Sequence, residues 1–128
     1  MGTAGSELEA LLSRLVSIDS VNPDLVPGAR GEAEIGAFAA GWLRDRGLEV
    51  ALQDAGRAGR ANVIAVARGT GGGRSLMLNA HMDTVGGAGM RVPFEPAIRN
   101  GKLFGRGSMD TPRARLPRSW TRPQTRGR

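Results

Sequence analysis

The segment SLMLNA at residues 75–80 is the feature that most constrains the fold of this chain. It is a short and almost entirely apolar run, which is typical of a strand buried inside a sheet. A strand buried in this way has to be covered by other elements of the chain, and helices are the usual cover in α/β proteins. The run therefore predicts that helices elsewhere in the chain cover it.

Two helical patterns precede this run. Residues 6–18 carry apolar side chains at helical spacing behind a capping box, so we expect a helix that ends near residue 18. Residues 32–46 repeat the pattern, and Gly47 is placed to end the second helix. Between them, residues 20–31 contain two prolines and several turn-forming residues, which predicts a loop.

Strand-like runs follow at residues 48–52, 62–67 and 75–80, and a further β-like stretch lies within residues 93–111. A helix pair followed by several apolar strands predicts an α/β sandwich, although the sequence leaves the polarity of the sheet only partly decidable. With 128 residues the chain is one domain at most.

Composition excludes some classes of site. Cysteine is absent, so neither a disulfide framework nor a zinc cluster of thiolates can form, and a reducing compartment is acceptable. The first residues lack the pattern of a secretion signal, and no apolar run approaches the length that spans a bilayer. We therefore expect a soluble, cytoplasmic protein with no membrane partner.

The net charge of +6 is unevenly distributed. Residues 1–111 are balanced, with 12 basic and 12 acidic side chains. Residues 112–128 contain six arginines and no acid, together with three prolines, and show no apolar helical face. We therefore divide the chain into a domain at 1–111 and a tail at 112–128. Clustered arginines can neutralise nucleic-acid phosphates, which is one reading of the tail.

The single histidine, His81, comes where the run at 75–80 stops, and reactive groups in α/β sheets collect at such strand ends. Asp83 follows two positions later, so in an extended chain both side chains project to the same side. A carboxylate placed there can accept a hydrogen bond from the ring N–H of the nitrogen that does not bind the metal. A plain hydrogen-bonded histidine would show the same spacing, so the pair alone leaves both readings open.

A second segment, ending in Asp110, supports the metal reading. With it, the sequence resembles the dinuclear zinc aminoacylases and carboxypeptidases, which include acetylornithine deacetylase, succinyl-diaminopimelate desuccinylase and the glutamate carboxypeptidases. LMLNAHMDTV resembles the first family signature, and residues 93–110 resemble the second, PFEPAIRNGKLFGRGSMD. The resemblance covers residues 6–111. It implies that the chain is the N-terminal, incomplete part of a zinc-peptidase-like α/β sandwich.

Carried over by motif, the resemblance implies that His81 ligates a metal ion, that Asp83 is the catalytic-site residue orienting its imidazole, and that Asp110 bridges two ions. Imidazole and carboxylate suit Zn²⁺, with Co²⁺ as a possible substitute. The implied activity is hydrolysis of amide bonds in N-acyl amino acids or small peptides. A homodimer is implied only for an intact family member.

The family's later features have no counterpart in this sequence: a glycine-containing helix after the bridging aspartate, a Glu-Glu pair and a second histidine. Since catalytic zinc takes about three protein ligands, we expect this chain to be inactive and to bind zinc weakly or not at all. Regrouping the codons from residue 112 by one base can yield Lys-Gly and later Leu-Met-Asp, which resembles that missing helix. Residues 112–128 are accordingly expected to be disordered or out of frame.

Two other hypotheses stay open at this stage. One is a small soluble binding protein whose arginine-rich tail contacts nucleic acid, although a basic run is a weak signal for such a partner. The other treats His81 and Asp110 as structural residues of a small α/β domain. The occurrence of two signatures in the family's order favours the hydrolase over both.

Overall fold

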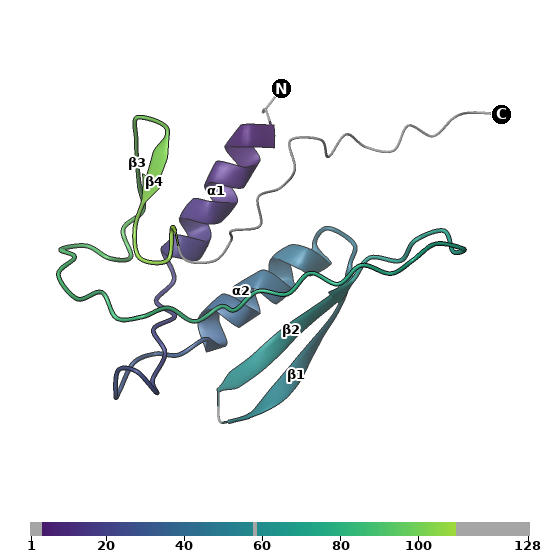
Figure 1. The fold of residues 1–128 in the computed structure, drawn as a ribbon, viewed down its shortest axis with the longest axis horizontal. Coiled ribbons are helices and arrows are strands. Elements are labelled where there is room, and N and C mark those ends of the chain that lie inside the picture. The colour runs from purple at the N-terminus through teal and green to yellow at the C-terminus, as the bar shows by residue number, and fades with distance from the viewer. Residues whose placement is uncertain (1–3, 58, 110–128) are drawn as a thin grey trace.

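The structure is a computed structural model that describes residues 4–57 and 59–109 (Figure 1). It contains two helices and two antiparallel hairpins. The elements are α1 (Ala4–Val16), α2 (Ala33–Arg44), β1 (Glu49–Arg57), β2 (Arg60–Val66), β3 (Ala97–Arg99) and β4 (Lys102–Phe104). This mixed α/β composition confirms the predicted fold class and fits an incomplete α/β domain.

Both predicted helices are confirmed. The first ends at Val16, two residues before the predicted end, and the chain beyond it stays buried at Ile18. The second ends at Arg44, and Gly47 donates its N–H to the Arg44 carbonyl at 2.8 Å with a φ of 79°. A positive φ of this kind favours glycine, which explains why the helix stops where the sequence predicts.

The hairpin of β1 and β2 packs against α2 (Figure 1). Its strands pair Glu49 with Val66 and continue in register to Asp54 and Ala61, after which the register shifts. The buried residues of α2 include Ile35, Gly36 and Ala40. Both strands predicted at 48–52 and 62–67 are therefore confirmed, although β1 continues to Arg57 and β2 begins at Arg60.

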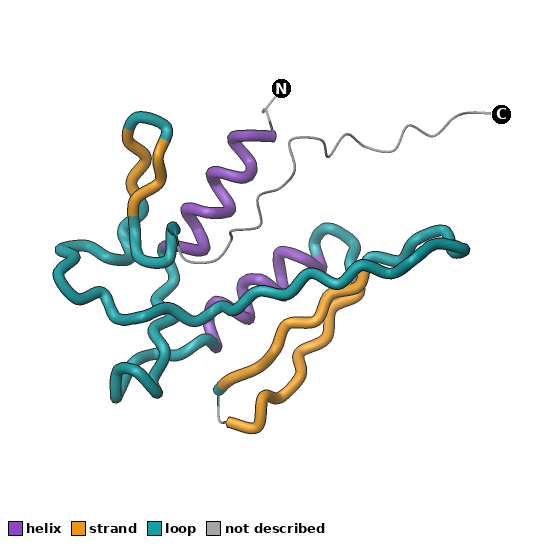
Figure 2. The backbone as a smooth tube through the Cα atoms, in the orientation of Figure 1, coloured by secondary structure: helices purple, strands orange, loops and turns teal. Residues whose placement is uncertain are grey.

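The strand predicted at residues 75–80 is wrong. Figure 2 shows this stretch as part of a long loop between β2 and β3. Leu76, Met77 and Leu78 are 78%, 84% and 81% exposed. A strand is stabilised by the ladder with a neighbour, and in the described part of the chain β1 and β2 pair only with each other. The apolar pattern is real, but no described element covers it.

The chain becomes fixed again just after this loop. Val21 and Thr84 form an isolated parallel bridge, in which Thr84 donates its N–H to the Ser20 carbonyl at 3.0 Å and Asn22 donates to the Thr84 carbonyl at 2.9 Å. Ser20 and Val21 are almost fully buried. The predicted loop at 20–31 thus contains one short sheet-like contact. That contact places the residues after 80 beside those before 23.

The second hairpin, β3 and β4, turns at Asn100 and Gly101, whose φ angles are 52° and 70°. Two successive positive φ angles at Asn-Gly make the tight turn preferred between antiparallel strands. Beyond it, Gly105 lies against the end of α1, where an added Cβ would overlap Val16 Cγ1. This contact fixes the segment that leads toward residue 109 against the first helix.

Two predictions fall partly or wholly outside the described residues. The boundary between 1–111 and 112–128, and with it the nature of the tail, lies there, as does Asp110. Within the described residues, neither helix has the length and apolarity needed to cross a membrane.

Candidate metal-binding site

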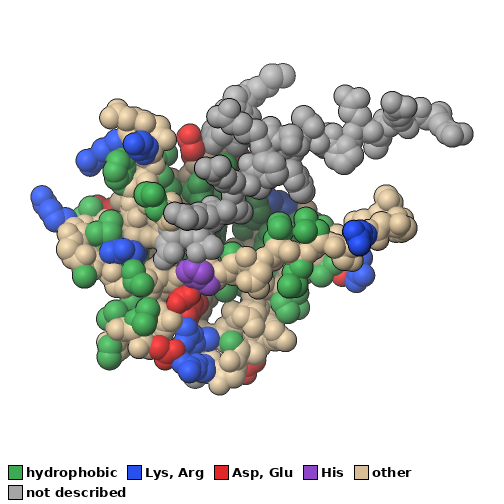
Figure 3. Space-filling view, in the orientation of Figure 1, with side chains coloured by type: hydrophobic (Ala, Val, Ile, Leu, Met, Phe, Trp, Pro, Cys, Tyr) green, Lys and Arg blue, Asp and Glu red, His purple; other side chains and the backbone are tan. Residues whose placement is uncertain are grey.

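His81 and Asp83 lie together, as their spacing predicts. The His81 Nδ1 atom is 3.1 Å from Asp83 Oδ1 and 3.0 Å from the Asp83 backbone carbonyl oxygen. The histidine side chain is about half exposed, at 49%, whereas that of Asp83 is 28% exposed. Figure 3 shows the histidine on the surface of the displayed face, with acidic and basic side chains beside it.

These contacts determine which ring nitrogen carries the proton. A carboxylate oxygen and a backbone carbonyl oxygen both accept hydrogen bonds and cannot donate them. His81 Nδ1 must therefore be the donor to Asp83, and in the neutral imidazole Nε2 is then the nitrogen with the lone pair. This is the tautomer in which Nε2 can serve as a metal ligand.

Asp83 is held from its other side by Asn22. The Asn22 Nδ2 group donates to Asp83 Oδ2 at 2.8 Å, so each carboxylate oxygen has its own partner. Partial burial raises the pKa of Asp83, but the hydrogen bond from Asn22 and the charge and hydrogen bond of His81 outweigh it. The net pKa lies below the ordinary 3.8, and the carboxylate is ionised at neutral pH.

The loop that carries Asn22 is anchored by charged residues. Asp24 pairs with both Arg57 and Arg60, and Arg60 also pairs with the buried Glu32. The hydrogen bond from Arg60 is the largest influence on Asp24 and lowers its pKa below 3.8, against a smaller desolvation effect. The Arg60 side chain is only 19% exposed, so the ion pairs that link the loop to β2 are partly buried.

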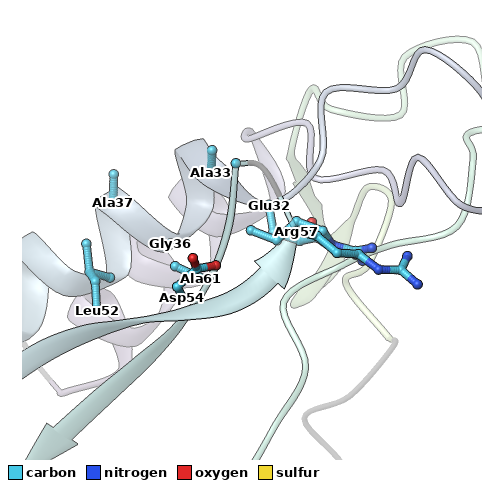
Figure 4. Close-up of a pocket in the computed structure, with 10 residues that line it drawn as sticks. Glu32, Ala33, Gly36, Ala37, Leu52, Asp54, Arg57 and Ala61 are labelled. Atoms are coloured by element: carbon cyan, nitrogen blue, oxygen red, sulfur yellow. The ribbon is translucent and has the colours of Figure 1, made fainter.

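Two hollows lie near this network. One, of about 320 Å³, is bordered by His81 and Asp83 on one wall and by Asp24, Arg57 and Arg60 on another. The other, of about 420 Å³, lies between α2 and the first hairpin and does not include the histidine (Figure 4). The first is the space in which a group bound at His81 would meet charged side chains.

The donor set at His81 suits a divalent ion but is incomplete. An imidazole whose N–H is accepted by a carboxylate is the arrangement that metal-ligating histidines usually show. Among residues 4–57 and 59–109, no three His, Cys, Asp or Glu side chains converge to hold an ion. The metal roles of His81 and Asp110, and the orienting role of Asp83 toward a bound ion, remain predictions. The structure adds Asn22, whose contact with Asp83 the sequence analysis did not predict.

A comparison with known protein families matches the segment that contains His81 and Asp83. Residues 77–112 match the model of peptidase family M20/M25/M40, and this stretch contains His81, Asp83 and Asp110. The match supports a relationship to that family broadly and a hydrolase of the metallopeptidase type, in a family that generally binds zinc or other divalent metals. No curated protein and no solved structure matches the chain.

Proposed function

We propose that this chain carries part of the metal site of a hydrolase that cleaves amide bonds in N-acyl amino acids or small peptides. His81 would be a ligand of the metal, Asp83 would fix its imidazole, and Asp110 would be a further metal ligand. The observation that carries the proposal is the hydrogen bonding of His81 Nδ1 to two acceptors of Asp83, at 3.0 and 3.1 Å. It presents Nε2 as the nitrogen with the lone pair.

His81 and Asp83 each have a defined role in this proposal. The His81 ring supplies a neutral nitrogen, and the ionised Asp83 holds the Nδ1 proton and favours the positive charge that builds up on a ligated imidazole. A bound zinc ion supplies Lewis acidity toward an amide carbonyl and lowers the pKa of a bound water. The half-exposed position of His81 beside a hollow leaves access for a ligand of small size.

In the part of the sequence that the structure describes, this chain holds too few converging donors for turnover. It has one histidine and no cysteine, while catalytic zinc takes about three protein ligands. The described residues contain no cluster of three donors. We therefore include in the proposal that the 128-residue chain binds one divalent ion weakly through His81 and does not hydrolyse amides by itself.

Titration with Co²⁺, followed by its visible absorption, tests the metal role. Binding is expected for the natural sequence, with at least a tenfold weaker affinity for His81→Ala and for Asp110→Ala. Asp45→Ala is the matched control, because this exposed acid at the end of α2 is remote in sequence from both motifs. Equal affinity of the natural sequence and His81→Ala would overturn the proposal.

The same protein, loaded with Zn²⁺, should leave N-acetyl amino acids and dipeptides intact. Hydrolysis that disappears on chelation and in His81→Ala would refute the proposed inactivity while strengthening the assignment of the reaction. Hydrolysis that survives His81→Ala would mean that another site is responsible, and the proposed site would be wrong.

A further inference from the structure

We propose that Asn22 is a positioning residue, which fixes the Asp83 carboxylate and through it the tautomer of His81. The inference rests on the proposed function only in assigning this contact a role in metal binding. The contact itself involves no metal. The relevant contact joins residues 61 positions apart, from Asn22 Nδ2 to Asp83 Oδ2 at 2.8 Å.

The orientation of the Asn22 amide is determined by its surroundings. Its Oδ1 atom accepts the backbone N–H of Asp24 at 2.8 Å, in the pattern of an Asx turn. A backbone N–H can only donate, so the oxygen of the amide must face it and the NH₂ group must face Asp83. A flipped amide would place two acceptors, Oδ1 and the Asp83 carboxylate, against each other.

The backbone of Asn22 is fixed as well. Its N–H donates to the Thr84 carbonyl at 2.9 Å, next to the bridge between Val21 and Thr84. Thr84, the residue after Asp83, is thus tied to Ser20 and Asn22 by main-chain hydrogen bonds. The side-chain contact is then made between two segments that are already in place, so little conformational freedom is lost in forming it.

The effect on His81 follows from the geometry of a carboxylate. With Oδ2 held by Asn22, the plane of the Asp83 carboxyl group is fixed, and Oδ1 is directed at His81 Nδ1. Without that bond, the half-buried carboxylate can rotate and the Nδ1–H tautomer loses its best acceptor. Loss of a hydrogen bond to a charged group should change the ratio of the two tautomers about tenfold.

The presence of a single histidine makes the test direct. In a long-range ¹H–¹⁵N spectrum of the metal-free chain, only one imidazole contributes, so the ratio of its two tautomers can be read without assignment. The spectrum is recorded at alkaline pH, and the ratio is taken where it no longer changes with pH. The Nδ1–H tautomer should predominate in the natural sequence, and the ratio should fall about tenfold in Asn22→Ala.

A second variant separates positioning from loop structure. Asn22→Ser introduces no charge, and its hydroxyl can still accept from the N–H of residue 24 but is too short to reach Asp83. It should change the tautomer ratio as strongly as the alanine variant, while the amide of Thr84 keeps its protection from hydrogen exchange. Gln53→Ala, which removes an amide hydrogen bond on the exposed hairpin, should leave the ratio unchanged.

A tautomer ratio within twofold of the natural sequence in both Asn22 variants, with a clear fall in Asp83→Ala, would overturn the inference. If both variants lose the protection of Thr84, the contact is tested in the natural sequence instead. The measurement is the nuclear Overhauser effect between the Asn22 NH₂ protons and the Asp83 Hβ protons. Its absence refutes the contact, and its presence supports it. Because no metal is involved, failure of Co²⁺ binding would refute the proposed function and leave this result standing.

Discussion

The contact between Gly105 and the end of α1 yields a prediction whose size can be worked from the structure. Gly105 has a φ of 152°, and a Cβ added there would overlap Cγ1 of Val16, which is 7% exposed. Overpacking a core costs about 1–3 kcal/mol, and an L residue in a sparsely populated backbone region costs about 1–3 kcal/mol more. Gly105→Ala should therefore lower the free energy of unfolding by about 2–6 kcal/mol.

The two contributions can be separated by a double-mutant cycle in urea, followed by tryptophan fluorescence, to which Trp42 on α2 contributes. Val16→Ala alone removes two buried carbon atoms and should cost about 1.6 kcal/mol, at about 0.8 kcal/mol for each. In the Gly105→Ala background the same substitution makes room for the new Cβ, so its cost should vanish or change sign. The backbone contribution of Gly105 stays.

Gly41 provides the control, because nothing lies within 4 Å of a Cβ added at this position in α2. Gly41→Ala should stabilise the chain by about 0.5–1 kcal/mol through helix propensity alone. If Val16→Ala costs the same in both backgrounds to within about 0.5 kcal/mol, the packing of Val16 on Gly105 is not as described.

Three further outcomes are expected. Arg60→Met should destabilise the chain by about 3 kcal/mol in urea unfolding, because it leaves the buried Glu32 without its partner, and Glu32→Leu in the same chain should recover most of the loss. The folded-state pKa of Asp24 is lowered, so its contribution is complete above pH 3.8 and is lost as the pH falls through the lower folded value; natural and Asp24→Asn chains should therefore converge in unfolding free energy on acidification. Replacing Leu76 and Leu78 by serine should reduce binding of the dye ANS and leave the urea midpoint unchanged, since these side chains are 78% and 81% exposed.

The sequence predicted the elements whose signals are local. Helical spacing identified α1 and α2, and Gly47 marked the end of the second helix, because a positive φ of 79° at that position is a property of the adjoining residues alone. The β-like stretch before Gly105 was also confirmed as the hairpin of β3 and β4. Its Asn-Gly turn could have been named as well, since the dipeptide is a strong hairpin signal.

The run at 75–80 shows where local signals end. An apolar pattern states that a segment should be covered, but a strand also needs a neighbour with an unpaired edge in the right place. In the described residues, β1 and β2 pair only with each other, the outer edge of each stays unpaired, and the apolar run is a loop. The prediction failed because an apolar pattern does not by itself specify which strand a segment pairs with.

The site was predicted in part for a similar reason. The spacing of His81 and Asp83 by two positions gave their contact directly, because residues so close in an extended chain share a side. The contact of Asn22 with Asp83 depends on the parallel bridge between Val21 and Thr84, and no periodicity in the sequence encodes a pairing of that range. The Asn-Pro dipeptide predicts a turn, but it does not predict the hydrogen-bond partner of the Asn22 side-chain amide.

The uncovered run and the site are held by different contacts, which has a consequence for any variant of this chain. His81 follows directly on the exposed residues, yet its position depends on Asp83 and on the bridge at Thr84, both of which come after it. Serine substitutions at Leu76 and Leu78 should therefore change self-association without moving the tautomer ratio of His81. A joint change in both properties would show that the run at 75–80 helps to hold the site, and that the hydrogen bonds through Asn22 are insufficient by themselves.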